Sequence, residues 1–167
     1  MKNMRRVKGK YLQHISGESR VLDVGGRGRK THDRSYQAIF ADVLEYRIAD
    51  IFEGPGVTDI MPGPYTLPFE NNYFDLVISG QTLEHVPNPF NLVAEMKRVM
   101  KRGGRMVIIV PSAGPRHDQK DYWRFMDNAF EAITEDCQMQ IVANWITENA
   151  PDERSRKWRD NVFVGTK

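Results

Sequence analysis

Residues 21–28 read Val-Leu-Asp-Val-Gly-Gly-Arg-Gly, an apolar run with one acid that passes directly into a glycine-rich turn. This pattern is typical of a buried strand that leads into a nucleotide-binding loop. Residues 74–79, Phe-Asp-Leu-Val-Ile-Ser, repeat the strand pattern, and Leu-Glu-His-Val follows at 83–86. Parallel sheets bind their ligands just beyond such strand ends. The two segments therefore predict a cofactor-binding α/β domain.

Length and charge favour one ordinary soluble domain. The chain has 167 residues, of which 40% are hydrophobic, and its formal net charge is +2. We expect a single domain over residues 1–167, with a leading helix and turn in 1–19. The charge lacks the excess typical of a dedicated nucleic-acid or membrane-surface protein. No apolar segment of signal or membrane-spanning length follows the basic start, so we expect a cytoplasmic protein.

The cysteine count limits the chemistry further. Cys137 is the single cysteine, which excludes an internal disulfide framework and a multi-cysteine zinc site. We expect Cys137 to be a buried packing thiol. The sequence predicts no metal site.

Apolar periodicity predicts a doubly wound, mostly parallel open sheet of about seven strands with helices on both faces. The spacing predicts strands at 21–24, 46–51, 57–60, 74–79, 105–110, 140–145 and 161–165. It predicts helices at 7–15, at 35–45 and at 128–135, and a loop at 61–65. A further helix is expected to take Asn88 as its cap and Pro89 as its first residue, with Lys101–Arg102 and Gly103–Gly104 marking its end.

From about Arg20 onward the chain resembles class I S-adenosylmethionine-dependent methyltransferases, in particular compact domains that carry Leu-Asp-Val-Gly early (22–25) and Leu-Glu-His-Val (83–86) after the fourth strand. The resemblance implies S-adenosyl-L-methionine as cofactor and S-adenosyl-L-homocysteine as product. It implies methyl transfer to an oxygen, nitrogen or carbon atom of an acceptor that the sequence does not identify. Small molecules, sugars and lipid-linked intermediates are all admissible acceptors, and a small molecule is favoured.

The resemblance also implies a set of cofactor-binding residues. The first acid and the glycines would hold the methionine end, and an acid that ends the second strand would accept from both ribose hydroxyls. The family's adenine-contacting acid is replaced here by Pro62-Gly63-Pro64-Tyr65, so adenine contacts would come from backbone groups or from stacking on Tyr65. The glycine loop is also one residue shorter than the family's. The predicted set is Asp23, Gly25, Gly26, Gly28, Asp50, Ile51, Tyr65, Ser79 and Gln81.

Other nucleotide-binding loops fit the residues less well. A dinucleotide fingerprint requires glycine where Thr31 stands, and a phosphate-binding P-loop requires glycine directly before Lys30, where the chain has Arg29. A plain tight turn remains an alternative for the glycines, and a solvated strand end remains one for Asp50.

The acceptor side is expected in residues 111–125, a polar and aromatic segment that follows the fifth strand. His117 is a candidate general base that Asp118 or Asp121 would orient. His85 is a second candidate catalytic residue, and its alternative is a structural histidine in the turn after the fourth strand. For Trp123 and Phe125 we favour core packing over a role in shielding the reaction from water.

We expect two basic segments to be exposed to solvent. Arg154, Arg156, Lys157 and Arg159 surround Trp158, but neighbouring acids dilute their charge. The second basic segment lies beside the glycine loop and consists of Arg27, Arg29 and Lys30. The alternative to solvent exposure is that these residues bind an anionic methyl acceptor. The rival hypotheses for the whole chain are a non-catalytic cofactor-binding or partner subunit with the same fold, and a nicotinamide-dependent reductase. The oligomeric state is not predicted.

Overall fold

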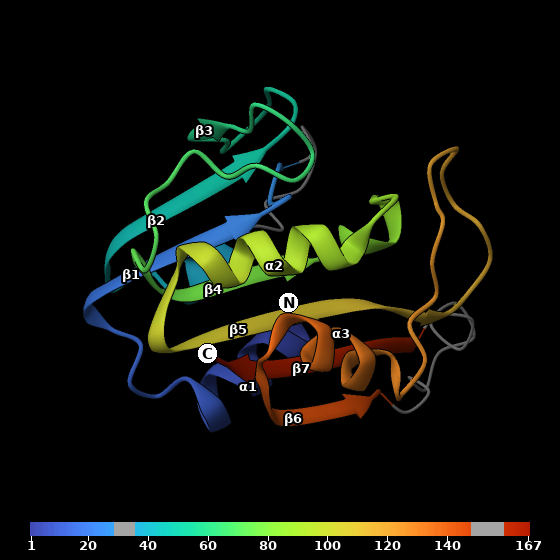
Figure 1. The fold of residues 1–167 in the computed structure, drawn as a ribbon. Coiled ribbons are helices and arrows are strands. Elements are labelled where there is room, and N and C mark those ends of the chain that lie inside the picture. The colour runs from blue at the N-terminus through green and yellow to red at the C-terminus, as the bar shows by residue number, and fades with distance from the viewer. Residues whose placement is uncertain (29–35, 148–158) are drawn as a thin grey trace.

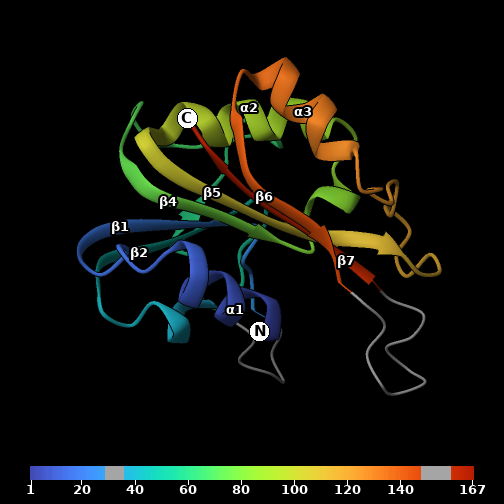
Figure 2. The ribbon, with the colours of Figure 1, turned by 90° about the horizontal axis from the view of Figure 1, so that it is seen from below.

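The structure is a computed structural model that describes residues 1–28, 36–147 and 159–167 (Figure 1). One sheet lies between two layers of helices, with α2 and α3 on one face and α1 on the other (Figure 2). The elements in chain order are α1 (Lys2–Tyr11), β1 (Gly17–Val24), η1 (Tyr36–Ile39), β2 (Val43–Asp50), β3 (Asp59–Ile60), β4 (Phe74–Gly80), η2 (Leu83–His85), α2 (Pro89–Val99), β5 (Met100–Ala113), α3 (Ala129–Cys137), β6 (Gln140–Ile146) and β7 (Arg159–Thr166).

The sheet has seven strands in the order β3-β2-β1-β4-β5-β7-β6. β1 pairs in parallel with both β2 and β4, and β4 pairs in parallel with β5. β7 runs antiparallel to its neighbours β5 and β6. The predicted doubly wound, mostly parallel sheet is confirmed. The strand order reverses between β1 and β4, which is the point where open α/β sheets bind ligands.

Two apolar clusters hold the helices on the sheet. On one face, α2 and α3 pack against strand residues such as Val77 and Phe163. The rings of Phe130 in α3 and Phe163 in β7 stack with their centres 4.5 Å apart. On the other face, Met4 and Val7 of α1 join a cluster that includes Ile78 of β4. Both faces of the central strands are therefore buried, as their continuous apolar sequences predict.

α2 begins as predicted and ends early. The Asn88 side chain accepts a hydrogen bond from the Asn91 N–H at 3.2 Å, and Pro89 is the first helical residue. The helix stops at Val99 because Met100 is extended and pairs with Phe74 in the sheet. Lys101–Arg102, expected to mark the helix end, therefore belong to β5, which is longer at both ends than the predicted strand.

Two predicted helices need correction. The 35–45 helix is wrong: among the described residues only the short 3-10 turn η1 forms, and Val43 and Leu44 belong to β2. Val43 pairs with Gly17 of β1, so the sheet partner outweighs the helical spacing of the apolar residues. The leading helix begins at Lys2 and ends at Tyr11 instead of covering 7–15, and Ile15 is buried in the connection that follows.

The remaining elements lie close to their predicted positions. The weak third strand shrinks to β3, β1 and β2 begin four and three residues earlier than predicted, and α3, β6 and β7 shift by one or two residues at their ends. Cys137 is buried at the end of α3, as expected. No described helix combines the length and apolar composition that a membrane crossing requires.

Candidate functional site

The glycine loop after β1 is packed too tightly for side chains. Gly25 has a φ of +76°, and a Cβ there would lie 2.3 Å from Oγ1 of Thr82. A Cβ on Gly26 would lie 2.5 Å from the carboxyl carbon of Asp23. Gly28 donates its N–H to the carbonyl of Pro55 at 2.9 Å. The loop therefore lies directly against the acid of β1 and the turn that follows β4, and glycine is required for close approach.

Asp23 lies beneath this loop with its charge only partly compensated. Its side chain is 1% exposed, and Oδ2 accepts a hydrogen bond from the Tyr46 hydroxyl at 2.9 Å. Oδ1 is buried with no hydrogen-bond partner in the described part of the chain. Burial raises the pKa of Asp23 to about 7; the Tyr46 hydroxyl opposes this rise and the Asp50 charge adds to it. This oxygen is suited to a cationic or hydrogen-bond-donating ligand.

Asp50 ends the neighbouring strand β2 at the same edge of the sheet. Its Oδ1 accepts the Phe52 N–H at 2.9 Å, and its Oδ2 lies 3.9 Å from Nε of Arg27. The Arg27 guanidinium also lies 5.3 Å from the centre of the Phe52 ring, so the Arg27 side chain extends from the glycine loop to Asp50. Ile51 and Phe52 are 44% and 55% exposed. The Asp50 carboxylate therefore lies beside exposed apolar side chains, and this combination is suited to the hydroxyls and the base of a nucleoside.

The exit of β4 is tied to β1. Ser79 is fully buried and donates its hydroxyl to the Val24 carbonyl at 2.9 Å. Gln81 has a φ of +56° and donates from Nε2 to Asp160 of β7 at 3.0 Å. The side chains of both residues are therefore engaged within the protein, and their assignment to the cofactor stays a prediction. Sequence reasoning did not include Thr82 or Asp160 among the edge residues, because their proximity depends on the strand order.

Tyr65 lies in the loop between β3 and β4 and contacts the residue that caps the start of α2. Its hydroxyl accepts the Asn88 N–H at 3.2 Å, and its ring packs against the core cluster under α2. Adenine stacking on Tyr65 remains a prediction.

A second group of polar residues lies where the loop after β5 meets η2; this loop stands out from the sheet beyond the end of β5 (Figure 1). Asp121 pairs with Arg124 through contacts of 2.5 and 2.7 Å, and its Oδ2 lies 2.9 Å from Nδ1 of His117. The Arg124 hydrogen bonds hold the pKa of Asp121 well below its usual range. Of the two acids expected to orient His117, the structure places Asp121 against its ring.

His85 and Glu84 complete this group. Nδ1 of His85 lies 2.5 Å from the Lys120 carbonyl oxygen, and the rings of His85 and His117 meet edge to face with centres 5.0 Å apart. Glu84 is 0% exposed, and its Oε1 lies 3.7 Å from Nε2 of His85. The structure therefore brings together the two histidines predicted as catalytic. Sequence reasoning did not assign Glu84; its signal was an acid between Leu83 and His85 in the turn after β4.

Comparisons with known proteins show what the chain is similar to. A family model described as a methyltransferase domain matches residues 31–108. Demethylmenaquinone methyltransferase of Oceanobacillus iheyensis is 30% identical over 102 residues, which cover 59% of this chain and 42% of that protein. Residues 31–108, just under half of the chain, are therefore similar to a methyltransferase domain. An uncharacterized protein of Methanocaldococcus jannaschii is 38% identical over 97 residues, covering 58% of this chain and 46% of that protein.

Solved structures share the fold. The YcgJ protein of Bacillus subtilis matches with a TM-score of 0.71 at 15% identity, covering 97% of this chain and 98% of that one. A 1,6-didemethyltoxoflavin N1-methyltransferase of Burkholderia thailandensis, solved with its substrate and S-adenosylhomocysteine, matches with a TM-score of 0.72 at 18% identity, covering 99% of this chain and 78% of that one. This chain spans about half the length of the curated relatives it matches.

The two aromatic residues expected in the core, Trp123 and Phe125, differ in their burial. Phe125 is buried and stacks near Phe130, which confirms its prediction. Trp123 is 42% exposed, so its predicted burial is wrong. Its indole N–H donates to the Val86 carbonyl at 2.9 Å, and this hydrogen bond holds the ring across the turn after η2 instead of in the core.

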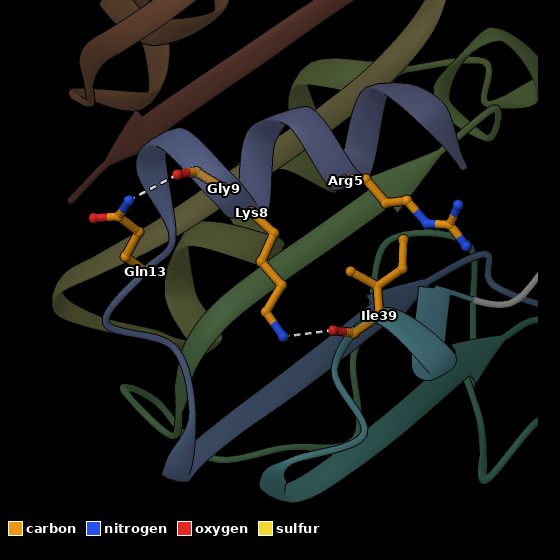
Figure 3. Close-up of a pocket in the computed structure, with 5 residues that line it drawn as sticks. All are labelled: Arg5, Lys8, Gly9, Gln13 and Ile39. Atoms are coloured by element: carbon orange, nitrogen blue, oxygen red, sulfur yellow. Dashed lines mark hydrogen bonds between the residues drawn. The ribbon is translucent and has the colours of Figure 1, made fainter.

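A depression in the described part of the chain lies away from these residues. It has a volume of about 420 Å³ and lies between α1 and η1, lined by Arg5, Lys8, Gly9, Gln13 and Ile39 (Figure 3). Lys8 donates to the Ile39 carbonyl at 2.5 Å, and Gln13 donates to the Gly9 carbonyl at 2.8 Å. The polar groups of Lys8 and Gln13 are therefore hydrogen-bonded to the protein's own backbone. Open α/β sheets bind their ligands beyond the carboxyl ends of the strands, so no site is assigned to this depression.

Several predicted interactions lie outside the described residues. They are those of Arg29, Lys30 and Thr31 beside the glycine loop, and those of Arg154, Arg156, Lys157 and Trp158 in the basic run.

The buried carboxyl of Asp23 predicts a pH-dependent stability. Its pKa is about 7 in the folded chain against 3.8 as the ordinary value, so the folded state holds a proton that the unfolded state releases between about pH 4 and 7. Stability therefore falls as pH rises through this window. Asp23→Asn should be more stable than wild type near pH 8, by up to about 4 kcal/mol, and should lose this gain near pH 4.

Urea unfolding at the two pH values measures this effect. The control is Asp136→Asn in α3, at an exposed position, which should leave the pH dependence unchanged. An Asp23→Asn variant with the wild-type pH profile would contradict the burial argument.

Proposed function

We propose that this chain binds S-adenosyl-L-methionine at the carboxyl edge of β1 and β2 and transfers its methyl group to a small organic acceptor. The observation that carries the proposal is the pair of acids on adjacent strands. Asp23, with one buried oxygen that lacks a partner in the described structure, lies under the glycine loop, and Asp50 ends the next strand. Residues 1–167 would act as one domain, since a single sheet includes strands from both halves of the chain.

The residues present fit the cofactor. Oδ1 of Asp23 would accept from the ammonium group of the methionine end, which supplies the positive charge that this buried carboxyl lacks. Oδ2 of Asp50 would accept from the ribose hydroxyls, in place of its contact with Arg27. The exposed side chains of Ile51 and Phe52 would cover the base. Gly25 and Gly26 give the close backbone approach.

The remaining chemistry needs positioning more than reactive groups. The cofactor supplies a methyl group already activated on a sulfonium. The protein has to align the acceptor and exclude water. Tyr122, Trp123 and Met126 expose large apolar surfaces in and just after the loop that follows β5, which favours an acceptor with a planar or apolar part. The relatives and structures named for demethylmenaquinone and didemethyltoxoflavin methylation are consistent with such an acceptor.

Calorimetric titration with S-adenosylmethionine, S-adenosylhomocysteine and NADH tests the donor half. We expect a Kd near micromolar for the two adenosyl compounds, roughly −8 kcal/mol, and no heat from NADH. Failure of both adenosyl compounds to bind, or preferential binding of NADH, would overturn the proposal. Binding without release of S-adenosylhomocysteine in the presence of any of a panel of quinols, phenols and heteroaromatic amines would favour a non-catalytic cofactor-binding subunit.

A further inference from the structure

We propose that Glu84, His85 and His117 form a binding site for a divalent transition-metal ion of the zinc class. One ligand atom from each residue lies within 4.8 Å of the other two. Two residues come from the turn η2 after β4, and the third comes from the loop after β5. The sequence alone predicts no metal site, because only the parallel pairing of β4 and β5 brings these segments together.

His85 has the arrangement of a metal ligand. Its Nδ1 lies 2.5 Å from the backbone carbonyl oxygen of Lys120, which can only accept, so this contact favours the neutral ring that carries its proton on Nδ1. The other ring nitrogen, Nε2, then carries a lone pair and faces Glu84 at 3.7 Å from Oε1. A backbone carbonyl that fixes the tautomer is the usual second partner of a ligating imidazole.

His117 has an equivalent support. Its Nδ1 lies 2.9 Å from Oδ2 of Asp121, and its backbone N–H donates to the same oxygen. Asp121 is in turn held by Arg124. A carboxylate behind an imidazole fixes its orientation and makes its far nitrogen a better ligand.

Glu84 supplies the independent observation that a ligand belongs here. Its side chain is completely buried, and neither carboxylate oxygen has a hydrogen-bond partner among the described residues. Its backbone carbonyl accepts the Tyr122 N–H at 2.8 Å, which fixes the residue against the loop. A buried carboxylate without donors is costly, and a cation shared with two imidazoles removes that cost.

The donor set selects the class of ion. Two imidazole nitrogens and one carboxylate suit zinc, ferrous iron or cobalt, whereas magnesium and calcium prefer oxygen ligands throughout. Bonds of about 2.1 Å place tetrahedral ligands roughly 3.4 Å apart, so the group has to contract on binding. His117 lies in an exposed stretch of loop and can approach without moving the sheet. Three protein ligands leave a coordination position for water or another ligand.

This assignment concerns metal binding and is independent of methyl transfer. It gives the two histidines a different role from the general base expected from the sequence, because a nitrogen bound to a metal does not accept a proton.

The test uses the untagged full chain after removal of metals with a chelator. Zn²⁺ affinity is measured in competition with a chromophoric chelator, and Co²⁺ absorption reports the coordination geometry. We expect one ion per chain and visible Co²⁺ bands of a four- or five-coordinate site. His117→Ala, His85→Ala and Glu84→Gln should each weaken Zn²⁺ binding at least tenfold, and Asp121→Asn should weaken it about 10- to 100-fold through the orientation of His117.

His14→Ala removes an exposed histidine outside the group and serves as the matched control. His117 is itself partly exposed, so its variant should remain folded, which circular dichroism checks. Wild-type protein that retains no Zn²⁺ in the competition, or a His117→Ala variant that binds as well as His14→Ala, would overturn the proposal.

Discussion

Asp50→Ala should raise the Kd for S-adenosylmethionine by about 30- to 100-fold. Asp50 ends β2 with one carboxylate oxygen on the Phe52 N–H and the other directed toward Arg27. Hydrogen bonds to a charged group contribute about 1.5–3 kcal/mol, and a ribose offers two hydroxyls to the second oxygen. Isothermal titration calorimetry with purified protein measures the change.

The matched control is Glu53→Ala, which removes an exposed acid three residues further along the same connection. It changes the net charge equally and should leave affinity within about twofold. Folding should be little affected by Asp50→Ala, since its partner Arg27 remains solvated. Equal affinities for Asp50→Ala and wild type would remove the ribose assignment.

Gly26→Ala should have a larger effect, with cofactor affinity reduced by at least about 100-fold. The added Cβ would lie 2.5 Å from both the carboxyl carbon and Oδ2 of Asp23. Either the loop or the acid has to move, and the proposed cofactor contacts depend on both. Such overpacking also costs about 1–3 kcal/mol of folding stability, which urea unfolding measures alongside the titration.

Gly9→Ala provides the control for an added Cβ, because Gly9 lies in α1, outside the proposed cofactor site, and a Cβ there meets nothing within 4 Å. It should bind the cofactor like wild type. Should Gly26→Ala bind the cofactor normally, the glycine loop would not be the place where the methionine end lies.

Much of the fold could be predicted because local and global signals agree in the central elements. The stretch at 21–28 and the strand at 74–79 are apolar on both faces, and Asn88–Pro89 mark the start of α2. The failures occur where tertiary pairing decides. Val43 and Leu44 fit a helical face by spacing, yet Val43 pairs with Gly17 in the sheet. The local sequence around Val43 carries no information about this distant pairing partner in β1.

The candidate site was predictable in part for the same reason. Asp23 and Asp50 are found by their position after strands, which sequence order reveals. Glu84 was missed because burial of a carboxylate depends on what packs around it, and the residues around it include Tyr122 and Arg124 from a segment far along the chain. The exposure of Trp123 was likewise hidden, since its hydrogen-bond acceptor is a backbone carbonyl.

The place of β7 between β5 and β6 imposes an order on folding. The strand nearest the end of the chain pairs with both of these earlier strands, and its Asp160 also accepts from Asn3 in the first helix. As the chain leaves the ribosome, β5 presents an unpaired edge from the time it is complete until residues 159–166 have emerged. During that interval the nascent protein is open to strand-edge aggregation, and the sheet closes only when β7 enters between β5 and β6.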